Sequence, residues 1–120
     1  MSFFRQWPAQ LITVQCSGIH LQIYRADRFL SRAIGLLGSR SLESHEGLWL
    51  QHCNSIHTFG MRYEIDALGV DEKSRITDMR PRIRPMRCAR LRGASAVIEL
   101  RAGACQELGL SIGDTIDWGR

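Results

Sequence analysis

Alternation of apolar and polar residues predicts two β-hairpins in this chain. The first joins a β-rich run at 11–15 to an alternating run at 20–24 through a Ser-Gly turn. The second joins residues 62–70 to residues 75–79 through a polar cluster that is typical of a tight reversal. Since the strands of a hairpin pair antiparallel, we expect a mostly antiparallel sheet.

Between the hairpins the period changes from that of a strand to that of a helix. Apolar residues recur at helical spacing from Asp27 to Gly38, and arginines occupy the opposite face. Asp27 can accept hydrogen bonds from the free amides of a first turn, and Gly38 can adopt the left-handed conformation that ends a helix. The main helix of the protein is therefore predicted here.

The remaining apolar runs complete the predicted sheet. Residues 47–51, 94–100 and 115–118 read as strands, and the middle one is expected to be central because both of its faces are mostly apolar. A short helix is expected within residues 102–108. The whole pattern predicts an α+β fold with a twisted, barrel-like, mostly antiparallel sheet of six or seven strands, one main helix and one short helix.

The composition is that of an ordinary folded domain. Of the 120 residues, 44% are hydrophobic and 23% are charged, so the chain can form one core and lacks the signature of disorder. A single domain over 1–120 is predicted, with a loose N-terminal segment at 1–10. The N-terminus lacks the apolar core of a secretory signal, and no apolar run reaches the ~18 residues of a membrane span. A cytoplasmic location is therefore expected.

Four cysteines, at positions 16, 53, 88 and 105, lie far apart and form no CxxC pair. This spacing is a poor match to a disulfide framework or a zinc ribbon. Cys53 and His57 supply only two of the three or four ligands that zinc requires. We therefore expect reduced thiols, no metal site and no cofactor.

Arginine dominates the basic residues, with 15 arginines against one lysine and a formal net charge of +4. The main cluster lies at 80–92, where two prolines oppose pairing inside a sheet, so a loop or a sheet edge is predicted. Two interpretations stay open: a solvated edge, or an anion-binding surface for nucleic acid or a protein partner. No aromatic residue lies between Tyr63 and Trp118 to stack on bases, which disfavours nucleic acid. The arginines considered for anion contact are Arg80, Arg82, Arg84 and Arg87.

The stretch at 47–70 carries most of the chemically interesting side chains, between and beside two strand-like runs. The leading hypothesis is a non-enzymatic binding or accessory domain with a pocket for a small polar or anionic ligand. Such sites combine apolar and aromatic walls, which Trp49 and Tyr63 would supply, with a few placed polar groups. The predicted rim consists of Asn54, His57, Thr58, Asp66 and Glu99.

A hydrolase-type enzyme is the alternative. It would use His57 and Asp66 as base and orienting acid, or Cys53 as a nucleophile activated by a neighbouring imidazole. A structural interpretation is also open, in which Cys53 is a small buried residue and the carboxylates of Glu64 and Asp66 bond to arginines or to loop backbone. The question of catalysis is left open, with binding favoured.

An ordered series of short motifs runs through the chain: Gly35-Leu36-Leu37, Gly47-Leu48-Trp49-Leu50, Ser55-Ile56-His57-Thr58-Phe59-Gly60-Met61, Ile65-Asp66, Val97-Ile98-Glu99-Leu100 with Ala102-Gly103, and Leu108-Gly109-Leu110 with Gly113-Asp114. In this order the motifs resemble the domain-of-unknown-function family number 192. The resemblance covers about residues 28–118 and implies a compact mixed α/β domain with a barrel-like sheet, found in bacteria and archaea, whose activity is not established. Many relatives look exported, and many carry a Phe-Trp-Met-Lys-Asn-Thr type of central motif from which residues 57–61 depart.

Overall fold

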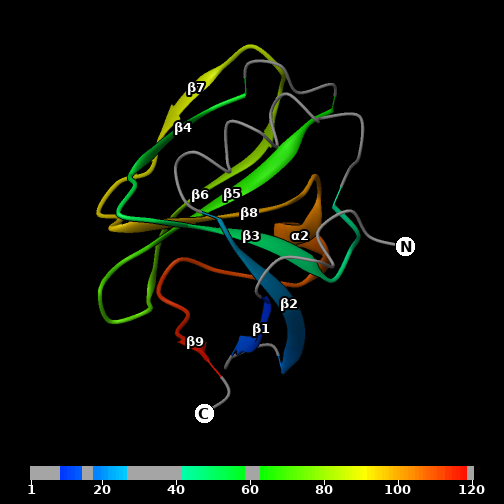
Figure 1. The fold of residues 1–120 in the computed structure, drawn as a ribbon, viewed down its shortest axis with the longest axis vertical. Coiled ribbons are helices and arrows are strands. Elements are labelled where there is room, and N and C mark those ends of the chain that lie inside the picture. Colours follow the sequence, from blue (N-terminus) through cyan, green and yellow to red (C-terminus); the bar gives the residue numbers. More distant parts are fainter. Residues whose placement is uncertain (1–8, 15–17, 27–41, 59–62, 119–120) are drawn as a thin grey trace.

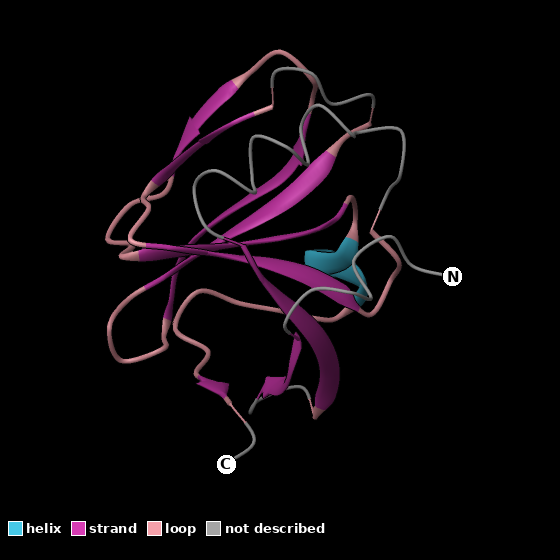
Figure 2. Cartoon of the chain, in the orientation of Figure 1, coloured by secondary structure: helices cyan, strands magenta, loops and turns pink. Residues whose placement is uncertain are grey.

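A curved, mixed sheet of seven strands forms the body of the protein in a computed structural model that describes residues 9–14, 18–26, 42–58 and 63–118. The strand order is β6-β5-β8-β3-β2-β1-β9, and β4 pairs with β7 in a separate small sheet (Figures 1 and 2). The elements are β1 (Ala9–Val14), β2 (Ile19–Ala26), β3 (Glu46–Gln51), β4 (Ser55–His57), β5 (Ile65–Val70), β6 (Ile76–Ile83), β7 (Cys88–Arg90), β8 (Ala96–Arg101), α2 (Ala104–Glu107) and β9 (Ile116–Asp117).

The predicted α+β fold class is wrong, because the described part of the chain is mostly β with one short helix. The sheet is mixed, since β2 and β3 run parallel. It is also no closed barrel: its two edge strands, β6 and β9, form no ladder with each other. An isolated bridge between Arg75 and Thr115, next to these strands, and a few backbone hydrogen bonds, such as that from the amide of Ile116 to the carbonyl of Ser74 (2.8 Å), are what link them. The chain between β2 and β3 is long enough for the crossover that parallel pairing needs, and hairpin signals do not reveal such a pairing. The predicted main helix at 27–38 lies outside the described residues.

Both predicted hairpins are confirmed, since β1 pairs antiparallel with β2 and β5 with β6. The strand predicted at 94–100 is also confirmed as β8, which lies between β5 and β3 and is buried except at Arg101. The segment at 80–92 contributes the end of the edge strand β6 and all of β7, as the loop-or-edge prediction expected. The short helix is present as α2 and packs beside β8.

Alternation along β8 divides the core into two clusters, one on each face of the sheet. Ile98 and Leu100 belong to one cluster, which also receives Trp49 and Trp118 in an edge-to-face contact with ring centroids 4.9 Å apart. Val97 belongs to the other, which we call the upper cluster. The other buried members of the upper cluster are Tyr24, Leu42, Leu48, Leu50, Ile56, Ile65, Ala67, Ile83 and Leu91.

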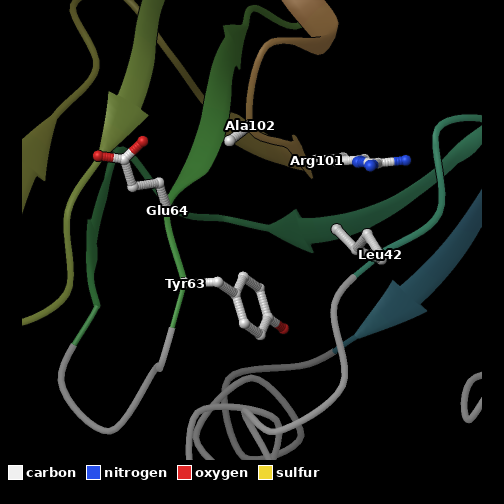
Figure 3. Close-up of a pocket in the computed structure, with 5 residues that line it drawn as sticks. All are labelled: Leu42, Tyr63, Glu64, Arg101 and Ala102. Atoms are coloured by element: carbon white, nitrogen blue, oxygen red, sulfur yellow. The ribbon is translucent and has the colours of Figure 1, made fainter.

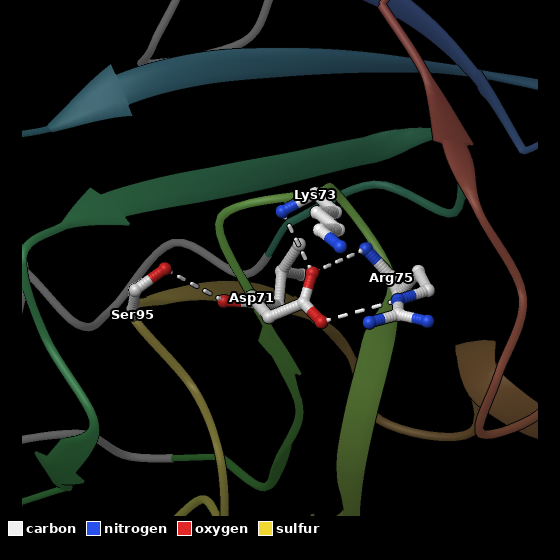
Figure 4. A network of polar contacts seen from close by, with 5 residues as sticks. Asp71, Lys73, Arg75 and Ser95 are labelled. Atoms are coloured by element: carbon white, nitrogen blue, oxygen red, sulfur yellow. Dashed lines mark hydrogen bonds and ion pairs between the residues drawn. The ribbon is translucent and has the colours of Figure 1, made fainter.

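Asp71 fixes the turn of the β5–β6 hairpin (Figure 4). Its Oδ1 accepts hydrogen bonds from the backbone amides of Lys73 (2.9 Å) and Arg75 (3.0 Å), and the Arg75 Nε lies 3.3 Å from its Oδ2. These contacts, led by the Arg75 amide, lower the pKa of the Asp71 carboxyl. Ser95 donates to the carbonyl of Val70 at 3.3 Å, which joins the turn to the start of β8.

Gly69 in β5 provides a test of the packing on the upper side of the sheet. A Cβ at this position would lie 2.9 Å from the Cβ of Leu91 and 3.0 Å from the Cβ of Ala94, and neither neighbour is the end of a flexible side chain. We expect Gly69→Ala to lower the free energy of unfolding by about 1–3 kcal/mol, measured by urea denaturation. Adding Ala94→Gly should recover part of the loss, whereas an unchanged stability in Gly69→Ala would contradict the packing.

Candidate functional site

Asp66 is fully buried and its carboxylate is engaged by backbone amides. Oδ1 accepts hydrogen bonds from the amides of Arg82 (2.8 Å) and Gly103 (3.0 Å), and Oδ2 accepts one from Cys105 (2.9 Å). Gly103 has a φ of 90°, which favours glycine, and so can present its amide to Asp66 immediately before α2. Asp66 therefore connects the edge strand β6 and the start of α2 to β5, the second strand of the sheet.

The Cys105 thiol next to this carboxylate is held in its protonated form. Burial first, and then the negative charge of Asp66, raises the pKa of Cys105 to about 12. A thiol with so high a pKa is not ionised near neutral pH and is a poor nucleophile or metal ligand.

Thr58 is also buried and also holds backbone. Its hydroxyl donates to the carbonyl oxygen of Arg84 at 2.6 Å and accepts from the amide of Arg87 at 2.9 Å. The backbone of Thr58 adds two further bonds, to the carbonyl of Arg87 and from the amide of Met86. Thr58 thus fixes the connection between β6 and β7.

Two other predicted rim residues, Asn54 and His57, lie just before and at the end of β4 in the small sheet. Asn54 and His57 are exposed, and His57 pairs with Cys88 in the β4–β7 ladder. The thiol of Cys53 donates to the carbonyl of Ser55 at 2.8 Å. The predicted rim residues from this part of the chain therefore fall into two groups. Thr58 and Asp66 are buried and bond to backbone, whereas Asn54 and His57 are exposed.

A hollow of about 300 Å³ lies where the end of β8 meets the residues just before β5. In Figure 3 the ring of Tyr63 extends toward Leu42, Arg101 lies on the side of Leu42, and Glu64 turns to the opposite side. Glu64 Oε1 is 3.7 Å from Arg82 Nη1. The hollow is lined by Leu42, Tyr63, Glu64, Arg101 and Ala102.

Glu99 shares a face of β8 with Arg101, two residues further along the strand. Its side chain is only 7% exposed, and no described residue donates a hydrogen bond to its carboxylate. Burial raises the pKa of Glu99 to about 7. Glu99 also acts on the hollow, because burial and then the charge of Glu99 raise the pKa of the lining residue Tyr63 to about 12.

The arginines considered for anion contact follow the free edge of β6 and the loop after it. Arg80 Nε lies 3.6 Å from Asp78 Oδ2, and Arg82 pairs with Glu64. Arg84 and Arg87 are exposed. Arg80 and Arg82 thus each have an acidic partner nearby, on β6 and just before β5 respectively.

The described residues contain no group of three or more His, Cys, Asp or Glu side chains placed to hold a metal ion. Cys53, Cys88 and Cys105 are free thiols. None of the helices in the described ranges is long and apolar enough to cross a membrane.

Arg101 and Leu42 were missed by reasoning from the sequence. The alternation of β8 contained a signal for Arg101, since a residue two places after Glu99 in a strand must share its face. No local signal marks Leu42, which reaches the hollow from the segment before β3, distant in sequence from both Tyr63 and Arg101.

The fold and sequence have known counterparts. The model of the family described as "Uncharacterized ACR" (DUF192) matches residues 12–118. A protein of unknown function from Novosphingobium aromaticivorans DSM 12444 is similar in structure, with a TM-score of 0.82 and 20% identity over 98% of this chain and 91% of that one. A protein from Sinorhizobium meliloti 1021, provisionally described as a transcription regulator, has a TM-score of 0.74 and 23% identity over 91% and 90% of the two chains. No curated protein matches the sequence.

The bonding of Asp66 can be tested with Asp66→Asn. The amide that replaces one carboxylate oxygen cannot accept a hydrogen bond from a backbone N–H, and the charge is lost, so we expect unfolding to become easier by about 2–4 kcal/mol. Asp114→Asn is the matched control, because Asp114 accepts one bond, from the amide of Ser111 at 2.9 Å on the surface, and its loss should cost about 1 kcal/mol or less. Equal losses in urea denaturation would refute the role given to Asp66.

Proposed function

We propose that this chain, which belongs to the domain-of-unknown-function family DUF192, is a binding domain that takes a small molecule with an anionic group into the hollow between Tyr63 and Arg101. The observation that carries the proposal is the hollow itself, whose lining includes an arginine, a tyrosine ring and an aliphatic side chain (Figure 3). Apolar walls with a few polar groups are typical of small-molecule sites.

The size of the hollow limits the ligand. About 300 Å³ is at the lower end of the range for small-molecule sites, roughly 300–1,000 Å³. A metabolite of a few carbon atoms fits this volume better than a nucleotide or a peptide does.

The charge at the hollow favours an anion. Arg101 is exposed and forms no ion pair with any described residue, whereas Arg82 and Glu64 are paired with each other. A guanidinium group presents a planar fork of donors that matches carboxylate and phosphate geometry. The ring of Tyr63 and the side chain of Leu42 would then cover the apolar part of the ligand.

The positions of the hydrolase candidates favour binding over catalysis. A nucleophile and its base must lie within hydrogen-bond reach of each other and of the substrate. His57 lies on β4, the carboxylate of Asp66 is bonded to three backbone amides, and the Cys53 thiol bonds to a carbonyl. None of the three lines the hollow.

Binding can be measured by thermal shift with a panel of small carboxylates and phosphate. At ten times its Kd a ligand adds about 1.4 kcal/mol of stability, which should raise Tm by roughly 5 °C in a domain of this size. Arg101→Gln should abolish the increase, because the guanidinium fork is lost. Arg90→Gln is the control: Arg90 is an exposed arginine on β7, and its loss should leave the increase unchanged.

Two results would overturn the proposal. One is the absence of any stabilisation of the wild-type protein across the panel. The other is an equal loss in both variants, which would mean that anions bind to the arginine-rich edge as a whole instead of in the hollow.

A further inference from the structure

The interior of the described chain contains four buried polar or charged side chains: Glu46, Thr58, Asp66 and Glu99. Buried polar groups in folded proteins are almost always hydrogen-bonded, so each exception requires an explanation. Thr58 and Asp66 are bonded to backbone, as described above. Glu99 is the exception among these four side chains, and the hydroxyl of Thr77 on β6 is a further buried polar atom without a hydrogen bond to any described residue.

Glu46 shows how the protein satisfies a buried carboxylate on the same side of the sheet. Its Oε2 accepts a hydrogen bond from the hydroxyl of Tyr24, and its Oε1 accepts one from the amide of Glu43, both at 3.0 Å. Glu99 lies on the next strand, directly opposite Leu48 in β3 and Ala67 in β5. Neither neighbour has a side-chain donor, so the strands that flank Glu99 provide no partner for its carboxylate.

The position of Glu99 relative to the hollow suggests where a partner would come from. Arg101, two residues away on the same face of β8, lines the hollow. Tyr63 also lines it and is close enough to Glu99 for the two to interact electrostatically. Glu99 is not itself one of the residues that line the hollow, so a ligand held by Arg101 and Tyr63 meets its carboxylate only by extending inward past them along this face of β8.

The charges around Glu99 determine which chemical group suits this inner end. Among the described residues, the titratable groups on this side of the sheet are Glu46 on β3, Tyr24 on β2, Cys53 after β3, Tyr63 before β5 and Arg101 on β8, with Glu64 at the wall of the hollow. Glu46 is buried, and the guanidinium of Arg101 is exposed. The inner end thus has an acidic character and the outer end a basic one, and an unpaired buried carboxylate is stabilised most by a cationic donor.

We propose that the ligand of this hollow is a small zwitterion, whose anionic group binds Arg101 and whose ammonium group donates hydrogen bonds to Glu99. The inference rests on the proposed function and adds the chemical class of the ligand. It makes Glu99 a residue that selects amino compounds over simple acids of the same length.

The test compares compounds that differ only in the amino group. Calorimetric titrations at pH 8 would use glycine, 4-aminobutyrate and 6-aminohexanoate, each beside the acid that lacks the amino group. We expect at least one amino acid to bind about tenfold more tightly than its matched acid, as a charge-assisted bond to a buried group is worth roughly that factor or more.

The pH dependence gives a second, independent readout. An ammonium group binds the ionised carboxylate, and a group with a pKa of about 7 is about nine-tenths ionised at pH 8 and about one-tenth ionised at pH 6. Binding of the amino acid should therefore weaken about tenfold from pH 8 to pH 6, because only the ionised fraction is competent. Binding of the matched acid should not weaken over this range.

Variants assign both effects to Glu99. Glu99→Gln should remove the advantage of the amino group and its pH dependence while binding of the matched acid is kept. Glu72→Gln, at an exposed position in the β5–β6 turn, should change neither. Arg101→Gln should weaken both kinds of compound. Circular dichroism and Tm show whether each variant is folded, and if Glu99→Gln is not, the two comparisons in the wild-type protein decide the question alone.

The outcomes separate this inference from the proposed function. If acids bind in an Arg101-dependent manner and the amino group adds nothing, the binding site stands and the zwitterion inference is wrong. If an amino acid binds more tightly than its acid but Glu99→Gln keeps that difference, the inference is also wrong. If neither class binds at any pH, both proposals are overturned.

Discussion

A carboxylate that is removed from water must find hydrogen-bond donors, and this constraint organises the described structure. Desolvation of an unpaired carboxylate costs several kcal/mol or shifts its pKa until it is neutral. Asp66 meets the constraint with three backbone amides from two distant segments. Glu46 meets it with a tyrosine hydroxyl and a backbone amide. Glu99 is buried in the same sheet and receives no hydrogen bond from any described residue, so burial alone raises its pKa to about 7.

The two hydrogen-bonded carboxylates, Asp66 and Glu46, each stabilise a segment next to the hollow. Asp66 joins β5 to the segment that follows β8, and so holds the end of β8 where Arg101 lies. Glu46 fixes the start of β3 against β2, close in sequence to Leu42 in the hollow wall. The free edge of the sheet is protected differently: β6 carries Pro81 and exposed arginines, which oppose pairing with another strand. Protection of this edge explains part of the excess of arginine over lysine, and that part requires no binding to nucleic acid.

The sequence predicted the local elements of the fold and not its long-range pairings. Alternation and turn residues identified both hairpins, the central strand and the short helix, because these signals lie within a few residues. The parallel contact of β2 with β3 and the three-residue pairing of β4 with β7 depend on where distant segments meet, and no local pattern encodes that. For the candidate site, the structural interpretation of Asp66 included bonds to loop backbone, but its donors at Gly103 and Cys105 are 37 and 39 residues away, and no local pattern identifies them.

The most direct test of the account is a carbon-13 NMR titration of the Glu99 side-chain carboxyl, in the protein alone and with an excess of 4-aminobutyrate. We expect a titration midpoint near 7 in the protein alone, far above the ordinary value of 4.5. We also expect a lower midpoint with the ligand, because a bound ammonium group favours the ionised carboxylate. A midpoint near 4.5 in the protein alone would show that Glu99 is solvated or already paired, and an unchanged midpoint on ligand addition would contradict its role in binding.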